Sequence, residues 1–224
     1  MLIRRLSAIG TCAAIVVVAL LAGRSSAGLV PSLVPSSFVT DTVMLLLALV
    51  VIRTRPGFSL ADFGFTRGSF RWTPGILLWV LPTAALAALS LARRQDAEPA
   101  GPAAGFSAVQ IVLFVWIYAS VAEEILTRGL LQTLVAGRRD SGTRHRWLSD
   151  SVIVSGLFFG AMHLVLISSM GAAAVVPIVL ATFLGIVAAR YRESTGSLLP
   201  AILVHALFNI GGTLPLWTAE WLRR

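Results

Sequence analysis

The sequence alternates between long apolar runs and short polar connections. Runs of about 18–28 residues can cross a hydrocarbon core of about 30 Å, because an α-helix rises about 1.5 Å per residue. Such runs occupy residues 6–23, 29 or 38 to 52, 74–92, 106–135, 148–167, 172–189 and 197–217. The pattern predicts an all-α, polytopic membrane helical bundle with about seven transmembrane helices. No internal repeat or linker divides the sequence, so we expect a single membrane domain over residues 1–224.

The first run also has features of a secretory signal peptide. A basic head precedes its apolar core, and the small residues at positions 25–27 resemble a cleavage site. The apolar core is long for a signal peptide, however, and further apolar runs follow it. We therefore expect an uncleaved first span.

Two polar features near the second run are expected at the membrane surface. Residues 53–73 are rich in arginine, glycine and aromatic side chains, with too few apolar positions to span a membrane. Aromatic rings prefer the membrane–water interface, and the expected anchors here are Phe58, Phe63, Phe65, Phe70 and Trp72. Asp41, in the first turns of the second run, is expected at the headgroup boundary.

The composition indicates lipid as the solvent. The chain has 57% hydrophobic and 12% charged residues, whereas a soluble domain carries about 25% charged residues. All 18 basic residues are arginines, and nearly all lie in the connections between apolar runs. There they act as topology signals and anchors to anionic headgroups, so the net charge of +8 gives no reason to expect nucleic acid. The lone Cys12 can form neither an internal disulfide nor a cysteine metal cluster.

The distribution of the arginines predicts an orientation. With the N-terminus in the cytoplasm, twelve arginines fall in inside segments and five in outside segments. This asymmetry follows the positive-inside rule and favours a cytoplasmic N-terminus. Arg223 and Arg224 are the exception, since they would lie on the outer side.

Three ionisable residues interrupt the fourth run. Each of Glu123, Glu124 and Arg128 costs roughly 2.5–3.5 kcal/mol at the centre of a membrane helix, so their presence points to a functional site. Glu124 and Arg128 are four residues apart and can form an ion pair on one helix face. Glu123 is rotated by about 100° and is expected to face a wetter cavity, as a general base requires.

Three further polar side chains lie in the last apolar runs. His163 is in the fifth span, and His205 and Asn209 share a face of the seventh. Taken singly, each fits a hydrogen bond between membrane helices. Together with the glutamates they suffice for hydrolysis, because a Glu with a His can deprotonate water while a His and an Asn donate to an oxyanion. They also suffice for a divalent metal such as zinc, although the sequence contains no HExxH motif.

These residues occur in three motifs with a known order. EExxxR is met by Glu123, Glu124 and Arg128, FxxxH by Phe159 and His163, and HxxxN by His205 and Asn209. The chain thereby resembles the CPBP family of intramembrane proteases, which includes the CAAX prenyl endopeptidases and the bacterial Abi-type proteins. The resemblance covers a protease core at residues 106–212. One departure is Thr127, where many members have an aromatic residue, and we expect it to alter the wall of the cavity.

The resemblance implies an endopeptidase in the bacterial cell membrane, with a cavity open to the cytoplasmic side and a membrane-associated protein or peptide as substrate. Glu123 and His163 would activate the water, supported by Glu124 and Arg128, and His205 and Asn209 would stabilise the tetrahedral intermediate. If a metal is used, its ligands would be Glu123, His163 and His205. A metal-free glutamate mechanism is equally compatible with the sequence.

Two other classes of function remain open. A non-catalytic membrane protein of the bacteriocin-immunity or scaffold type could keep the polar cluster for packing and bind a peptide or a membrane partner. A proton-coupled transporter could use the same side chains as a relay. The sequence shows no inverted repeats or paired broken helices, which counts against the transporter.

Overall fold

The computed structural model describes residues 2–26, 28–29, 34–93, 106–137 and 148–223. All regular structure in these ranges is helical and none of it is strand, which confirms the all-α prediction. The predicted loops at 95–105 and 137–146 lie outside the described residues, apart from Gly137.

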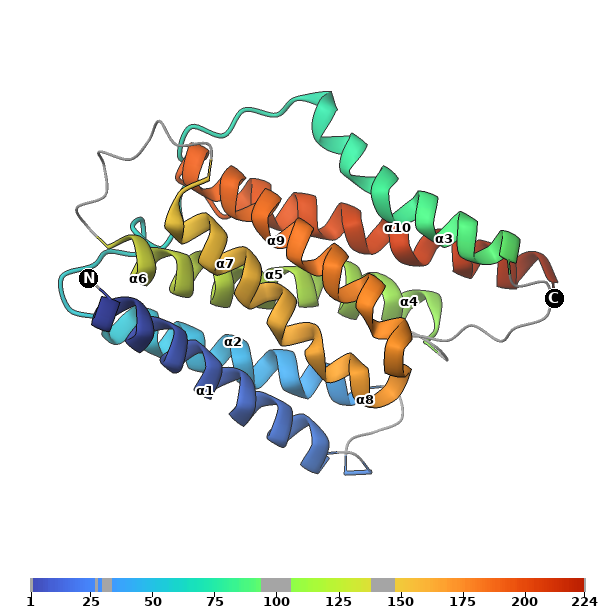
Figure 1. The fold of residues 1–224 in the computed structure, drawn as a ribbon, viewed down its shortest axis with the longest axis horizontal. Coiled ribbons are helices and arrows are strands. Elements are labelled where there is room, and N and C mark those ends of the chain that lie inside the picture. The colour runs from blue at the N-terminus through green and yellow to red at the C-terminus, as the bar shows by residue number, and fades with distance from the viewer. Residues whose placement is uncertain (1, 27, 30–33, 94–105, 138–147, 224) are drawn as a thin grey trace.

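Helices α1 (Leu2–Ser26) and α2 (Ser36–Thr54) pack side by side (Figure 1). The face of α1 toward the core is built mainly of small residues, which allow membrane helices to approach closely. Arg4 donates from Nη2 to the carbonyls of Val135 and Ala136, at 3.1 Å each. Arg5 pairs with Asp150 at 2.7 Å. The start of α1 is therefore tied to two other helices of the bundle.

A helix from Ala108 to Ala136 forms the centre of the bundle, and it contacts α1, α2 and three helices described below. Its segments are α4 (Ala108–Gln110), η2 (Ile111–Ala119), α5 (Ser120–Glu124), η3 (Ile125–Leu131) and α6 (Gln132–Ala136). The stretches η2 and η3 are π-helical and flank the short α-helical α5. Ser107 begins the helix with a capping box to Gln110, and Gly137, with φ of 68°, ends it.

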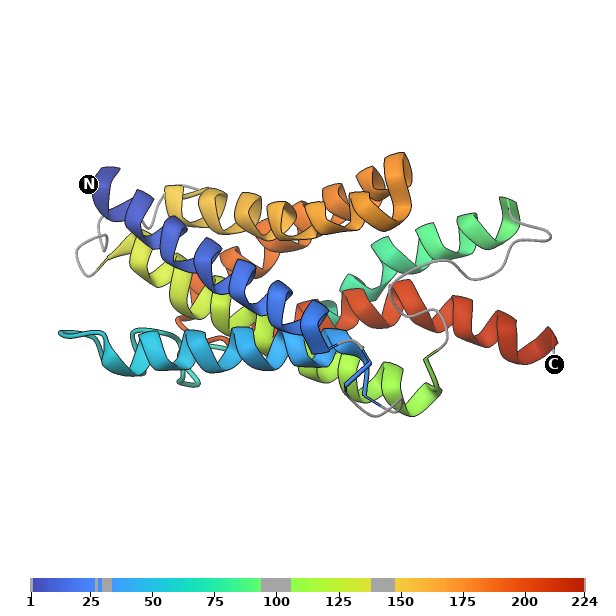
Figure 2. The same ribbon diagram turned by 90° about the horizontal axis from the view of Figure 1, so that it is seen from below.

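The next part of the chain folds back on itself. It comprises α7 (Asp150–Met162), η5 (His163–Leu166), α8 (Ile167–Met170), η6 (Gly171–Ala174) and α9 (Val175–Thr195). The reversal occurs at Gly171, so α9 runs back along α7 (Figures 1 and 2). Glycines allow the close approach, because a Cβ added to Gly185 would lie 2.8 Å from the Cα of Gly156. Both helices exceed the predicted bounds: residues 168–170 are helical, and the predicted polar turn at 190–196 is helical to Thr195.

The remaining helices are η1 (Pro74–Val80), α3 (Leu81–Arg93) and α10 (Leu199–Arg223), with α3 packed along α10. The connection before η1 is fixed to the end of α9 and the start of α10. Leu198 N donates to the Gly64 carbonyl at 3.0 Å, and Arg192 Nη2 donates to the Asp62 carbonyl at 2.7 Å. Phe63 is fully buried in the core, so the prediction that it anchors at the interface is wrong. Trp72, by contrast, is 56% exposed.

Four of the described helices are long and apolar enough to cross a membrane, namely Leu2–Ser26, Ser36–Thr54, Ala108–Ala136 and Asp150–Thr195. Two shorter apolar helices are Pro74–Leu89 and Leu199–Pro215. The helix Asp150–Thr195 contains the reversal at Gly171. These apolar helices support an integral membrane protein, while the count of seven spans and the cytoplasmic N-terminus stay predictions.

Candidate active site

The polar side chains predicted to form the site come from α5, η3, η5 and α10. Glu123 and Glu124 end α5, Arg128 lies in η3, and His163 is the first residue of η5. His205 and Asn209 lie in α10, which packs directly against α5 and η2. The structure therefore brings most of these residues to one region inside the bundle.

Glu124 and Arg128 form the predicted ion pair. Arg128 Nη1 lies 3.0 Å from Glu124 Oε1, and both side chains are completely buried. The guanidinium carbon of Arg128 is 4.5 Å from the centre of the Phe159 ring, a cation–π geometry. Arg128 Nη1 also donates to the hydroxyl of Thr127, which is itself fully buried. Thr127 thus supports the guanidinium from the position at which an aromatic residue would be expected.

His205 lies between the two glutamates. Its Nδ1 is 2.9 Å from Glu124 Oε1, a buried hydrogen bond across two helices. Its Nε2 is 3.8 Å from Glu123 Oε2. Because a carboxylate accepts hydrogen bonds, the contact with Glu124 favours a proton on Nδ1 of His205. The ring is therefore held with its second nitrogen toward Glu123.

Glu123 is the more accessible carboxylate. Its side chain is 18% exposed, compared with 0% for Glu124. Its Oε2 atom has no hydrogen-bond partner among the described residues. A carboxylate that is 18% exposed, beside a histidine, agrees with the expectation that Glu123 faces a wetter space than Glu124 does.

His163 joins the group through Phe159. Its Nδ1 is 2.9 Å from the Phe159 carbonyl, and its ring centre is 4.9 Å from that of Phe159. The Phe159 ring also makes an edge contact with the His205 ring, with 5.3 Å between the ring centres. Since a carbonyl only accepts, the contact places a proton on His163 Nδ1 and leaves Nε2 as a free acceptor.

Asn209 bonds to the central helix. Its Nδ2 donates to the Val115 carbonyl at 2.9 Å and to Ser120 Oγ at 3.1 Å. The two amide hydrogens of this side chain therefore both have acceptors. Donation to an oxyanion would require one of these bonds to open.

Three features of the site escaped the sequence analysis. The π-helical stretches η2 and η3 surround the glutamates, and π-helical turns occur frequently at functional sites. Ser120, fully buried, accepts the bond from Asn209. Asp41 of α2 is half-buried in the bundle, which its position near a helix start did not indicate.

A three-ligand metal site is not assembled in this arrangement. Within the described residues, no three His, Cys, Asp or Glu side chains form a group that could hold a metal ion. Glu123 and His205 approach each other, and the bond from His163 Nδ1 to the Phe159 carbonyl leaves Nε2 as the nitrogen that could bind a metal. The metal site over Glu123, His163 and His205 therefore stays a prediction.

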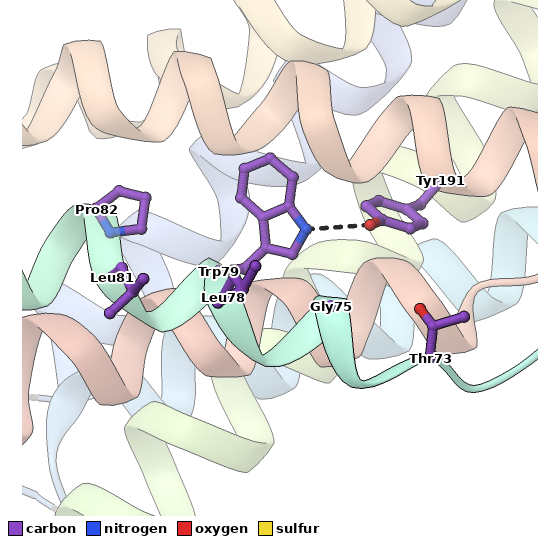
Figure 3. A pocket seen from close by; sticks show the side chains of 7 residues that line it. All are labelled: Thr73, Gly75, Leu78, Trp79, Leu81, Pro82 and Tyr191. Carbon is purple, nitrogen blue, oxygen red and sulfur yellow. Dashed lines mark hydrogen bonds between the residues drawn. The ribbon is translucent and has the colours of Figure 1, made fainter.

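A mainly apolar pocket of about 630 Å³ lies between η1, the start of α3 and the later part of α9 (Figure 3). It is lined by Thr73, Gly75, Leu78, Trp79, Leu81, Pro82 and Tyr191. Trp79 Nε1 donates to the Tyr191 hydroxyl at 3.1 Å, which fixes the indole ring in the wall. The same indole stacks on Phe208 at 6.2 Å between ring centres. Phe208 belongs to α10, so the wall of the pocket contacts the helix that carries His205 and Asn209.

The fold and the site define a class of protein: an all-helical membrane protein with buried carboxylate, guanidinium and imidazole groups. Residues 105–211 match the family model described as Type II CAAX prenyl endopeptidase Rce1-like. The match agrees with the CPBP resemblance and supports a CAAX-type protease with a membrane-associated protein substrate. No curated protein and no solved structure matches the chain.

Proposed function

We propose that the protein is an intramembrane endopeptidase in which Glu123 acts as general base toward a water molecule. The observation that carries the proposal is the unequal setting of the two glutamates. Glu124 is completely buried and paired with Arg128 at 3.0 Å, whereas the Glu123 side chain is 18% exposed. Removal of a proton from water needs a carboxylate that water can reach and that no ion pair occupies.

The surrounding groups support this reaction. In our proposal His163, with Nε2 as a free acceptor, assists Glu123 in holding the water. His205 receives its orientation from Glu124 and presents Nε2 beside Glu123, at 3.8 Å from Oε2.

Glu123 passes the proton taken from water to His205 Nε2, and the imidazolium so formed donates to the oxyanion of the tetrahedral intermediate. An Asn209 amide hydrogen released from Val115 or Ser120 donates beside it. When the oxyanion collapses and the C–N bond breaks, the Nε2 proton passes to the leaving amine.

The pocket of Figure 3 supplies a place for the hydrophobic end of the substrate. Its volume of about 630 Å³ is in the range of ligand pockets and exceeds what one side chain would fill. Bound there, an apolar anchor would hold the adjoining peptide against α10. This geometry fits cleavage of a peptide bond close to a membrane-embedded or lipid-like end.

The experiment uses the full chain purified into lipid nanodiscs and a set of membrane-anchored reporter peptides. Glu123→Gln should lower kcat by at least about 10²-fold, because the general base is lost while the shape is kept. Glu193→Gln is the matched control: Glu193 lies at the end of α9, pairs with Arg190 at 3.2 Å and should leave cleavage unchanged. Unchanged cleavage by Glu123→Gln would overturn the mechanism.

The same material separates the remaining alternatives. Chelator treatment and metal analysis of the nanodisc protein test metal use, which would require His163 to move toward Glu123 and His205. A biological phenotype that survives replacement of Glu123, Glu124, Arg128, His163, His205 and Asn209 would instead favour a binding role. The predicted cytoplasmic position of the site is tested by protease access to reporters in vesicles of known orientation.

A further inference from the structure

The hydroxyl group of Thr127 joins the guanidinium of the buried ion pair to the backbone of the proposed general base. Thr127 Oγ1 donates to the Glu123 carbonyl at 2.6 Å, a bond within one helix. A hydroxyl has a single hydrogen, so its lone pairs remain for another donor. That donor is Arg128 Nη1, and the side chains of Thr127 and Arg128 are both completely buried.

The two hydrogens of Arg128 Nη1 both have acceptors. One acceptor is Glu124 Oε1 at 3.0 Å, and the other is the Thr127 hydroxyl. Because the hydrogens lie in the plane of the guanidinium, two acceptors on one nitrogen fix the orientation of the whole group. The Phe159 ring lies 4.5 Å from its central carbon and supports that orientation.

Helix α7 holds the backbone of Thr127 in place. Ser155 is fully buried, and its Oγ donates to the Thr127 carbonyl at 3.0 Å. Phe159 follows Ser155 by four residues and so lies on the same face of α7. One face of α7 therefore contacts both the carbonyl of Thr127 and the guanidinium to which its hydroxyl bonds.

We propose that Thr127 is a positioning residue for His205 that acts through the buried ion pair. The contacts form a closed series: the Glu123 carbonyl, the Thr127 hydroxyl, the Arg128 guanidinium, the Glu124 carboxylate, the His205 ring and, 3.8 Å from its Nε2, the Glu123 carboxylate. Thr127 touches no reacting atom in this series. Its hydroxyl fixes the guanidinium, the guanidinium fixes the carboxylate, and the carboxylate orients the imidazole.

This inference rests on the proposed function, in which His205 Nε2 takes a proton from Glu123. Thr127→Val keeps the shape of the side chain but removes the hydroxyl. The kcat should fall about tenfold while KM stays within about twofold, because a displaced catalytic group slows the reaction more than it weakens binding. Thr127→Ser keeps a hydroxyl that bonds to the same carbonyl and should retain kcat within about threefold. Thr11→Val is the control, since Thr11 bonds to the Ser7 carbonyl of α1 at 2.9 Å, and it should change neither value.

A second measurement does not depend on cleavage. The chain has three histidines, so the ¹⁵N spectrum of histidine-labelled protein in nanodiscs is simple, and His205→Gln identifies the His205 signals. Thr127→Val should shift the Nδ1 resonance of His205, because the bond from Nδ1 to Glu124 Oε1 depends on where that carboxylate lies. Thr127→Ser and Thr11→Val should leave the resonance unchanged.

An unshifted His205 signal or an unchanged kcat in Thr127→Val overturns the inference. Equal losses of kcat in Thr127→Val and Thr127→Ser also overturn it, in favour of a packing role. Thr127→Ala, which lacks the hydroxyl and has less volume, takes the place of Thr127→Val if that variant does not fold. If the original protein cleaves no reporter, the proposed function fails, and the His205 spectrum then decides alone whether Thr127 orients His205.

Discussion

Breaking the buried ion pair from one side should be among the most destabilising single changes in this protein. Arg128→Met removes the guanidinium but keeps an apolar chain of similar reach. Glu124 is completely buried and would be left with His205 as its hydrogen-bonding partner. Removing one partner of a buried pair costs about 3–5 kcal/mol, because the other charge is left without compensation. The contact of Arg128 with Phe159, about 0.5–2 kcal/mol, is lost in the same change.

The double variant Glu124→Gln, Arg128→Met tests whether the cost comes from the unpaired charge. Glu124→Gln and Arg128→Met, made singly, each lower the free energy of unfolding. The sum of these two losses should exceed the loss in the double variant by about 2 kcal/mol or more, as expected for groups in direct contact. The free energy of unfolding is measured by circular dichroism during titration of mixed micelles with sodium dodecyl sulfate. Arg190→Met is the control, since its partner Glu193 is 23% exposed and surface pairs contribute at most about 1 kcal/mol.

Two results would refute this reasoning. One is a cost for Arg128→Met no larger than that of Arg190→Met. The other is additivity of the single changes within about 0.5 kcal/mol, which would mean that Glu124 and Arg128 do not stabilise each other.

Three further predictions concern packing, the central helix and the pocket. Gly156→Ala should destabilise the bundle by about 1–3 kcal/mol, since its Cβ would lie 2.9 Å from a backbone nitrogen of α9. Gly10→Ala is the control, because its Cβ would meet nothing within 4 Å, and thermal unfolding compares the two variants. Asn209→Ala should cost about 1–3 kcal/mol because it leaves a π-helical carbonyl without its donor, and chemical unfolding of a catalytically inactive Glu123→Gln background measures this cost apart from activity. Trp79→Ala should raise KM most for reporters with long apolar anchors, and an equal change for all reporters would exclude the pocket as their binding site.

The helices themselves were largely predictable from the sequence, because apolar runs of membrane length leave few alternatives. The ends of the helices were harder to predict. Helix α9 continues to Thr195 and ends where Gly196 adopts φ of 74°, so its end depends on backbone conformation more than on polarity. Phe63 was expected at the interface, but the connection that carries it folds over the end of the bundle and buries it. That placement depends on tertiary contacts with α9 and α10.

The site divides in the same way. The pair Glu124–Arg128 could be predicted because it lies within one helix, where spacing determines which side chains meet. The bond from His205 to Glu124 joins residues 81 apart and depends on how α10 rotates against α5. Contacts between helices are therefore the part that spacing alone could not supply.

The π-helical stretches have a consequence for comparing this chain with its relatives. A π-helical turn holds one residue more than the α-helical turn it replaces, so each such turn rotates everything after it by about 100° relative to a regular helix. Tyr118 lies within η2 and Glu123 after it, and their separation in number is therefore not a measure of their separation in angle. A relative whose helix is regular there would need one residue fewer to present the same two side chains to α2 and to the cavity. An ungapped alignment anchored on the glutamates would then pair residues upstream that occupy different faces of the helix.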